Sequence, residues 1–397
     1  YATEEILRVL LIAVGLSALH VSLPIGGAII ALLVIVGISY RQTIKAYPHG
    51  GGSYIVAKDN LGAGPALTAG AALLTDYVLT VAVSIAAAVA AVTSAFPELQ
   101  THRVLLGVGF ILLVTVLNLR GIRESGSIFS IPTYLFLAGI FVMLAVGFVR
   151  NALDGFAVQD PPPAAAHLAG NGALTLFVIL KAFSSGCAAL TGVEAISDGV
   201  PAFKPPEWKN ARTTLTVMIS ILTVTFAGIT FLAHQFGTYP MEANSSDYET
   251  VISQIARHTV GGGNVGYYFI QFVTMAILVL AANTAYSDFP RLAYFLARDK
   301  YMPRQYTLRG DRLAYSTGIL TLGLLSGTVL AIYQGEVEHL IPLYALGVFT
   351  SFTISQFAMF TRWQKRREPG WQMGRIINLT GATATAIVAA IVTITKF

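Results

Sequence analysis

Apolar residues fall into eleven long blocks along the 397-residue chain, and charged or Pro/Gly-rich breaks separate these blocks. Most blocks have about the 18–25 residues that a helix needs to cross roughly 30 Å of hydrocarbon. The pattern therefore predicts an all-α integral membrane protein with eleven spans. The expected spans cover residues 1–19, 22–40, 62–95, 102–119, 126–149, 173–199, 211–235, 264–297, 314–333, 339–361 and 375–397. The two longest, the third and the eighth, are expected to be tilted.

The basic residues indicate which ends of these spans face the cytoplasm. With the loop after the second span placed inside, 18 Lys and Arg residues lie in cytoplasmic connections and 4 on the opposite side. This asymmetry follows the positive-inside rule, so the first span runs outward and the eleventh ends outside. The basic cluster at 362–367 is interpreted as a cytoplasmic anchor or as a contact for anionic membrane lipids.

Composition excludes several classes of protein. The chain is 55% hydrophobic and 11% charged, whereas a soluble domain has roughly 25% charged residues. The net charge of +5 follows the membrane rule above and does not indicate nucleic acid. The single cysteine, Cys187, excludes a disulfide framework and a multi-cysteine metal site. We find no pattern for a metal cluster or for a nucleophile–base pair, so neither an enzyme nor a cofactor is expected.

Four polar residues form a stripe on the third span. At 100° per residue, Asp76, Tyr77, Thr80 and Ser84 fall at about 0°, 100°, 40° and 80° on an otherwise apolar helix. Hydroxyl groups can bond to their own backbone, which would explain Thr80 or Ser84 alone. An ionised carboxylate in mid-membrane costs at least about 2.5–3.5 kcal/mol, so Asp76 is predicted to be functional.

The sixth span carries a second polar site and a predicted break. The run Ser184-Ser185-Gly186 weakens a helix in mid-span, and an interrupted helix is tolerated in hydrocarbon where it lines a cavity. Thr191 and Glu194 share one helix face further along this span. A carboxylate buried without a fixed partner takes up a proton more readily. We therefore expect Glu194 to load a proton outside and to release it inside.

Two further stretches suggest gates. Glu4 and Glu5 precede an apolar run, as at the start of a half-helix. With Arg8 and Lys181 they are expected to form an outer ion-pair network, in which gating and simple structural pairing both remain open. The glycine-rich stretch at 47–54 lacks the Lys-Ser/Thr ending of a phosphate loop, so we expect a re-entrant or gating turn.

These motifs together resemble the amino acid–polyamine–organocation (APC) superfamily. They are Tyr-Pro-His-Gly-Gly-Gly-Ser-Tyr at 47–54, Gly-Val-Glu-Ala-Ile-Ser-Asp-Gly-Val-Pro-Ala-Phe-Lys at 192–204, and Lys-Asn-Ala-Arg at 209–212. The resemblance covers the whole chain, as one transmembrane transporter domain, 1–397. It implies a LeuT-like fold with two inverted five-helix repeats, 1–149 and 173–361, and an extra helix at 375–397. The first and sixth spans would be broken, with the substrate between the breaks.

Within that superfamily, the chain is similar to bacterial potassium importers of the KimA type, which are related to the KUP family. The matching residues are Tyr1, Asp76, Tyr77, Thr80, Ser84, Thr191, Glu194 and Tyr344. The resemblance implies potassium uptake coupled to protons in a bacterial plasma membrane. Potassium would be held by the seven residues other than Glu194, while Glu194 and Asp76 would carry the proton.

The chain departs from the family pattern at both ends. Family members carry an Asp-x-x-Ser-Ser stretch just before the tyrosine that matches Tyr1, and the chain opens on that tyrosine. They also usually have a twelfth span and often a cytoplasmic C-terminal domain for dimerisation and regulation. We therefore expect a longer native protein, with a truncated first span here and a homodimer formed through the C-terminal region.

The sequence thus predicts a secondary transporter that imports potassium with protons by alternating access. An amino-acid or polyamine permease of the same fold remains the main alternative, because Glu194 and its glycine neighbours do not separate the two. Asp76, Thr80 and Thr191 favour a cation. A channel would need neither a protonatable carboxylate nor paired broken helices.

Overall fold

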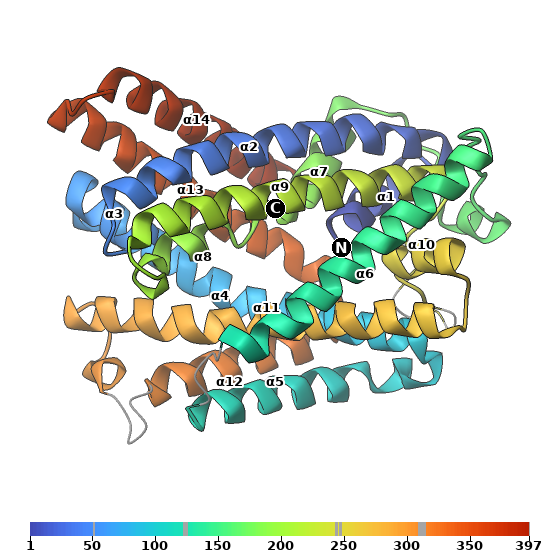
Figure 1. Ribbon diagram of the computed structural model, residues 1–397, viewed down its shortest axis with the longest axis horizontal. Coiled ribbons are helices and arrows are strands. Elements are labelled where there is room, and N and C mark those ends of the chain that lie inside the picture. The colour runs from blue at the N-terminus through green and yellow to red at the C-terminus, as the bar shows by residue number, and fades with distance from the viewer. Residues whose placement is uncertain (51, 122–125, 243–244, 246–247, 309–314, 397) are drawn as a thin grey trace.

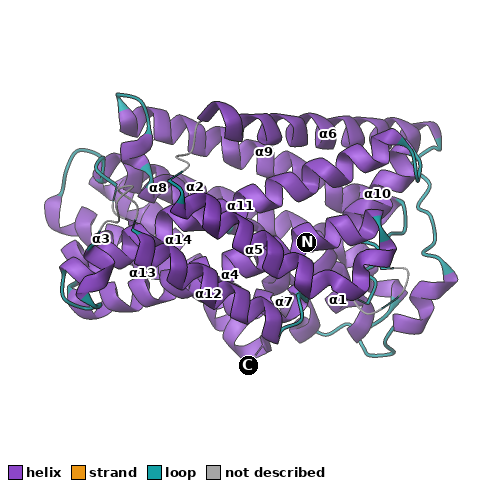
Figure 2. Cartoon of the chain, turned by 90° about the horizontal axis from the view of Figure 1, so that it is seen from below, coloured by secondary structure: helices purple, strands orange, loops and turns teal. Residues whose placement is uncertain are grey.

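The computed structural model describes residues 1–397 except 51, 122–125, 243–244, 246–247, 309–314 and 397. The described residues form helices and connecting loops, with no strand among them (Figure 2). Within this part of the chain, nine helices are long and apolar enough to cross a membrane. The predicted all-α membrane fold is confirmed at this level.

The helices follow the order of the predicted spans. Their bounds are α1 Ala2–Ala13, α2 Ser22–Ala46, α3 Gly52–Leu61, α4 Ala63–Ala95, α5 Arg103–Leu119, α6 Gly126–Leu153, α7 Leu176–Gly186, α8 Val193–Asp198, α9 Glu207–Gln235, α10 Val251–Val260, α11 Val265–Arg298, α12 Ser316–Ile332, α13 Val337–Arg366 and α14 Trp371–Lys396. Six short 3-10 turns join or extend them, at 16–21, 97–102, 163–168, 187–190, 200–202 and 304–307.

Two predicted spans are shorter than the pattern suggested. The expected span 1–19 divides into α1, of 12 residues, and the 3-10 turn Leu16–Val21. At 1.5 Å per residue α1 is about 18 Å long, which is less than the hydrocarbon thickness. Gly15, at φ +112°, separates the two pieces, because few other residues adopt that backbone conformation. Helix α12 is also short, at 17 residues.

Contacts at the two ends of the bundle agree with the alternating topology. Helix α3 lies at one end and α10 at the other (Figure 1). At the α3 end, Lys58 pairs with Asp299 at 2.5 Å, which joins α3 to the end of α11. At the α10 end, Arg103 of α5 pairs with Glu336, just before α13, at 2.8 Å. The α3 end is the basic-rich end, which we call the inner end, and the α10 end the outer end.

Helix α4 lies in the middle of the bundle and packs against α3, α5, α11, α12 and α13. It has 33 residues and its neighbour α11 has 34, so each is about 50 Å long. Small residues such as Ala82, Ala86 and Gly70 let neighbouring helices approach α4 closely. Helix α4 can therefore present its polar stripe to several helices at once.

The predicted break in the sixth span lies directly after the Ser-Ser-Gly run. Helix α7 ends at Gly186, a 3-10 turn follows at Cys187–Leu190, and α8 begins at Val193. Gly192 has φ +86°, a left-handed conformation that favours glycine. Gly186 packs against α1 and α2, because an added Cβ would lie 2.5 Å from the side chain of Ile6 and 2.6 Å from that of Ile29. The close packing at Gly186 and the left-handed backbone at Gly192 thus both depend on glycine here.

Candidate cation cavity

A cavity of about 480 Å³ lies between α1, α4, the break between α7 and α8, α9, α11 and α13. At its deep end it is lined by Glu194 and Asp288, and towards the outer end by Glu4, Arg103 and Glu336. Because its lining continues to the outer ends of α5 and α13, at Arg103 and Val337, the cavity is directed towards the outer side of the bundle.

All the site residues predicted from the sequence line this one cavity. They are Tyr1, Asp76, Tyr77, Thr80, Ser84, Thr191, Glu194 and Tyr344. They come from the start of α1, the polar face of α4, the break after α7, and α13. The structure therefore brings together residues up to 343 positions apart in sequence, while the roles given to them remain predictions.

Asp76 is half-buried on the α4 face that meets α13. Its Oδ1 atom is buried without a hydrogen-bond partner among the described residues. Gly347 of α13 allows the close approach, since an added Cβ would lie 3.1 Å from the Ala72 carbonyl and 3.8 Å from Asp76 Cβ. An unpartnered buried carboxylate oxygen is costly, so this atom is available to bind a cation or a proton in the cavity.

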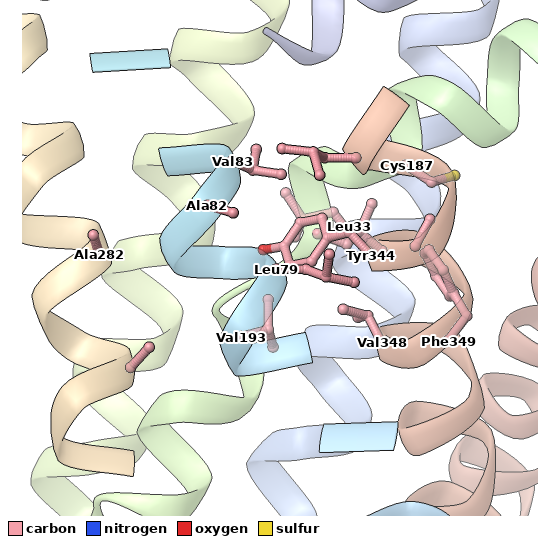
Figure 3. Close-up of a cluster of buried hydrophobic side chains, with 14 of the residues drawn as sticks. Leu33, Leu79, Ala82, Val83, Cys187, Val193, Ala282, Tyr344, Val348 and Phe349 are labelled. Carbon is pink, nitrogen blue, oxygen red and sulfur yellow. The ribbon is translucent and has the colours of Figure 1, made fainter. Parts of the chain in front are cut away.

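Tyr344 approaches the α4 stripe from the opposite wall. Figure 3 shows its ring extending from α13 between apolar side chains, with the hydroxyl oxygen beside α4 near Leu79. That hydroxyl lies close to the side chains of Thr80 and Thr191. Tyr1 interacts with Tyr344 and Thr191 from the start of α1. Several hydroxyl oxygens therefore converge at the break between α7 and α8.

Glu194 has fixed partners, which corrects the expectation of a carboxylate buried without them. Its Oε1 accepts a 3.0 Å hydrogen bond from the backbone N–H of Ser53 and a short one from the Ser53 hydroxyl. Its Oε2 accepts a 3.1 Å bond from the Ser351 hydroxyl of α13. Ser53 lies at the start of α3, which folds back after α2 so that its N-terminus meets Glu194. Both the helix N-terminus and the hydroxyl groups stabilise negative charge there.

The inner end of the cavity is closed by Tyr77 and Asp198. The Tyr77 hydroxyl donates a 2.9 Å hydrogen bond to Asp198 Oδ2, joining α4 to the last residue of α8. Gly52 packs against the same carboxylate, and an added Cβ there would collide with it. Arg291 of α11 donates to the Asp198 carbonyl at 3.4 Å. Gly52 of the glycine-rich stretch thus takes part in the inner closure, while the expected re-entrant or gating turn remains a prediction.

Asp288 lines both the main cavity and the small pocket beside Asp198. Its sequence position near the end of an apolar block did not predict that it lines the cavity, because the tilt and depth of α11 follow from packing. Ser53 and Ser351 also had no sequence signal, since a serine in a membrane helix most often bonds to its own backbone.

The outer ion-pair network forms in part. Arg8 bonds to Glu5 at 3.2 Å and to Glu4 at 3.4 Å. Glu4 also accepts a 3.4 Å bond from the backbone N–H of Val251, which ties α1 to α10. Lys181 makes no ion pair within the described part of the chain. Its inclusion in the network was wrong, because Lys181 lies on α7 away from the cavity lining.

A polar latch holds α3 against α11 at the inner end. Asp299 accepts hydrogen bonds from Lys58 at 2.5 Å and from the Tyr54 hydroxyl at 2.7 Å. Burial alone would raise the pKa of Asp299, but Lys58 and Tyr54 outweigh it and lower that pKa. Burial and the Asp299 carboxylate together raise the pKa of Tyr54. The ion pair is therefore formed at neutral pH.

The chemistry of the cavity suits a monovalent cation. Groups of three or more His, Cys, Asp or Glu that could hold a transition metal are absent from the residues that the structure describes. Hydroxyl and carboxylate oxygens line the cavity instead. Such oxygens replace the water of a potassium ion.

Residues 6–397 match the family described as amino acid permease. The potassium transporter KimA of Bacillus subtilis (strain 168) is 49% identical over 401 residues. This alignment covers 100% of the chain and 64% of KimA, so the chain spans slightly less than two thirds of that relative. Both matches agree with the resemblance seen in the motifs.

Proposed function

We propose that this chain, which belongs to the amino acid permease family of the APC superfamily, is the part of a plasma-membrane transporter that carries potassium inward with protons. The nine apolar helices among its described residues, together with its family, make it a multi-pass membrane protein and not an enzyme. The observation that carries the proposal is the shared cavity, where Asp76, Glu194 and a set of hydroxyl groups meet.

Potassium fits this cavity better than an amino acid does. Asp76 offers an unpartnered carboxylate oxygen, and Tyr1, Thr80, Thr191 and Tyr344 offer hydroxyl oxygens around it. An amino-acid site would instead need free helix ends for the carboxylate and ammonium groups of its substrate. The relative that is 49% identical is itself named a potassium transporter.

Glu194 is the proposed proton carrier, and its partners indicate which oxygen takes the proton. The backbone N–H of Ser53 can only donate, so Oε1 remains an acceptor in both states. The Ser351 hydroxyl can reverse from donor to acceptor, so the proton is placed on Oε2. Asp76 shares the cavity and feels the charge of Glu194. Protonation of Glu194 would thus change the affinity of Asp76 for a cation.

Alternating access follows from opening the inner closure. The cavity is directed outward while Tyr77 and Asp198 close its inner end. In the proposal, two inverted repeats at 1–149 and 173–361, followed by the extra helix at 375–397, move against each other around the cavity. Potassium would leave once α3, α8 and α11 separate at the inner end.

Growth rescue tests the proposed substrate. Expressed in a bacterium that lacks potassium uptake, the protein is expected to restore growth at micromolar potassium, and its Asp76→Asn variant is not. Uptake of labelled amino acids and of polyamines is measured in the same cells. Uptake of amino acids or of polyamines without growth rescue would overturn potassium transport and support the permease alternative.

A further inference from the structure

A second set of buried polar groups lies behind Glu194, between α2, α13 and α14. It begins with Ser351 and continues with Tyr40, Ser355, Gln356 and Asn378. None of these five is among the described residues that line the cavity. Each of the five is at most 1% exposed. This set is therefore separate from the space proposed for the cation.

Tyr40 of α2 lies near Glu194. Its ring packs edge-on against Phe352 with centroids 5.3 Å apart. Its hydroxyl oxygen is buried and has no hydrogen-bond partner within the described residues. The side chains of Ser53, Ser355 and Glu194 all lie near that hydroxyl. A phenylalanine would fill the same apolar space at a lower cost, so packing does not explain the hydroxyl.

Ser355 differs from the threonines of α13. Thr350, Thr353 and Thr361 each bond to the backbone carbonyl four residues earlier, at 2.7, 2.7 and 3.0 Å. The Ser355 hydroxyl is buried and makes no such bond, nor any other within the described residues. It lies one turn beyond Ser351 on the same face, towards the inner end. Its hydroxyl thus remains available on the side that faces Tyr40.

Polar groups continue from this point to the inner end. Gln356 is 0% exposed, and neither its oxygen nor its nitrogen has a partner among the described residues. Its side chain packs against Gly381 of α14, and the side chain of Ser39 of α2 packs near the same glycine. Ser39 bonds to Asn378 at 2.8 Å, and Asn378 bonds to Gln42 at 2.6 Å. Gln42 is half-buried one turn from the inner end of α2.

We propose that the proton carried by Glu194 leaves through this seam between α2, α13 and α14, on a route separate from the path of the cation. The inference rests on the proposed function, because it assumes that Glu194 carries a proton. Helix α13 runs from the outer to the inner end and α2 does the same, so the route from Ser351 of α13 to Gln42 of α2 leads inward as a whole.

The transfer balances without any further reactant. Glu194 gives the proton on Oε2 to the Ser351 oxygen while Ser351 passes its own proton to the next hydroxyl. Each hydroxyl ends with one proton and a reversed hydrogen bond, and Glu194 is left as a carboxylate bonded to Ser53. Between Ser355 and Gln42 the proton moves through bridging water, for which the Gln356 amide supplies a donor and an acceptor.

The charged groups around Glu194 favour two separate routes. Titratable neighbours come from α2 (Tyr40), α4 (Asp76 and Tyr77) and α8 (Asp198), while α3 and α13 present serines. Asp76, Tyr77 and Asp198 lie on the cavity side, where the cation passes. A positive ion there would repel a proton on the same path. Tyr40 lies on the opposite side and can pass a proton without meeting the cation.

Proteoliposomes separate proton release from cation movement. An inward proton gradient drives net rubidium uptake, and a trapped dye records the internal acidification. Rubidium exchange is measured with the same low pH on both sides, which keeps Glu194 protonated and requires no proton release. The test variants are Tyr40→Phe and Ser355→Ala. The matched controls are Tyr286→Phe, whose hydroxyl bonds to Thr115, and Ser326→Ala, whose hydroxyl bonds to the Val78 carbonyl.

For the test variants we expect net uptake and acidification to fall on the order of tenfold or more, while exchange stays within about twofold of the unmodified protein. The control variants should leave net uptake, acidification and exchange unchanged. Net uptake at the unmodified level in both test variants would overturn the route. An equal loss of net uptake and exchange would also overturn it, because it indicates a structural role. If the unmodified protein shows no rubidium exchange, the proposed function itself fails.

Discussion

Tyr77 donates a 2.9 Å hydrogen bond to Asp198, and this bond joins the wall of the cavity to the end of α8. It is made at the point where the broken sixth span meets the inner end of the bundle. Gly52 packs on the other side of the same carboxylate. The bond therefore links the cavity, the break and the start of α3 in one inner closure.

Removal of this bond should favour the inward-open state. A buried hydrogen bond contributes about 0.5–1.5 kcal/mol, so Tyr77→Phe is expected to increase the inward-open population roughly two- to tenfold. Labelling of a cysteine placed at Leu292, which lines the small inner pocket, reports this opening in a Cys187→Ala background. Faster labelling from the inner side supports the closure, and an unchanged rate contradicts it.

The latch between Lys58 and Asp299 should be insensitive to physiological pH. The pKa of Asp299 is lowered in the folded protein, so its contribution is present above the unfolded pKa of about 3.9 and is lost as pH falls through the folded value. The labelling rate at the Leu292 position, divided by the rate of a free thiol at the same pH, should therefore stay constant between about pH 5 and 8. Asp299→Asn should raise this ratio at every pH. A rise in the ratio with the unmodified latch within that range would show that another group controls the opening.

Asp76 should set the affinity for the cation. Asp76→Asn keeps the shape but removes the charge, and a cost of about 1.5–3 kcal/mol weakens potassium binding by roughly 10- to 150-fold. Calorimetric titration of the purified protein with potassium measures this change. Asp154→Asn, on an exposed turn, is the matched control. Equal affinities for the unmodified protein and Asp76→Asn would remove Asp76 from the site.

Gly186 should be needed for stability at the break. Its position leaves no room for a side chain, because Ile6 and Ile29 lie within 2.6 Å of an added Cβ. Gly186→Val is therefore expected to destabilise the protein by about 1–3 kcal/mol, seen as a lower melting temperature in detergent. Gly27→Val is the control, since nothing lies within 4 Å of an added Cβ there. Equal melting temperatures would contradict the packing described.

The sequence predicted the features that depend on local composition. Helical spans follow from apolar length, and the break after Gly186 follows from residues that weaken a helix locally. Asp76 and Glu194 could be singled out because an acid in hydrocarbon is costly wherever it lies. Their common cavity followed from the family resemblance, and the structure brings their side chains to one cavity.

Features that depend on long-range packing could not be predicted in this way. Ser53 reaches Glu194 across 141 positions and Ser351 across 157, and only the return of α3 into the bundle creates these contacts. Asp288 became a cavity residue through the depth and tilt of α11. Lys181 had the right charge for the outer network, but it makes no ion pair within the described residues.

Proton flux through Glu194→Gln tests the central claim most directly. Rubidium uptake and internal acidification are recorded together in proteoliposomes under an inward proton gradient. The unmodified protein should acidify the interior as rubidium accumulates. Glu194→Gln should still bind rubidium but should neither accumulate it nor acidify the interior. Undiminished proton-driven uptake by Glu194→Gln would contradict the account.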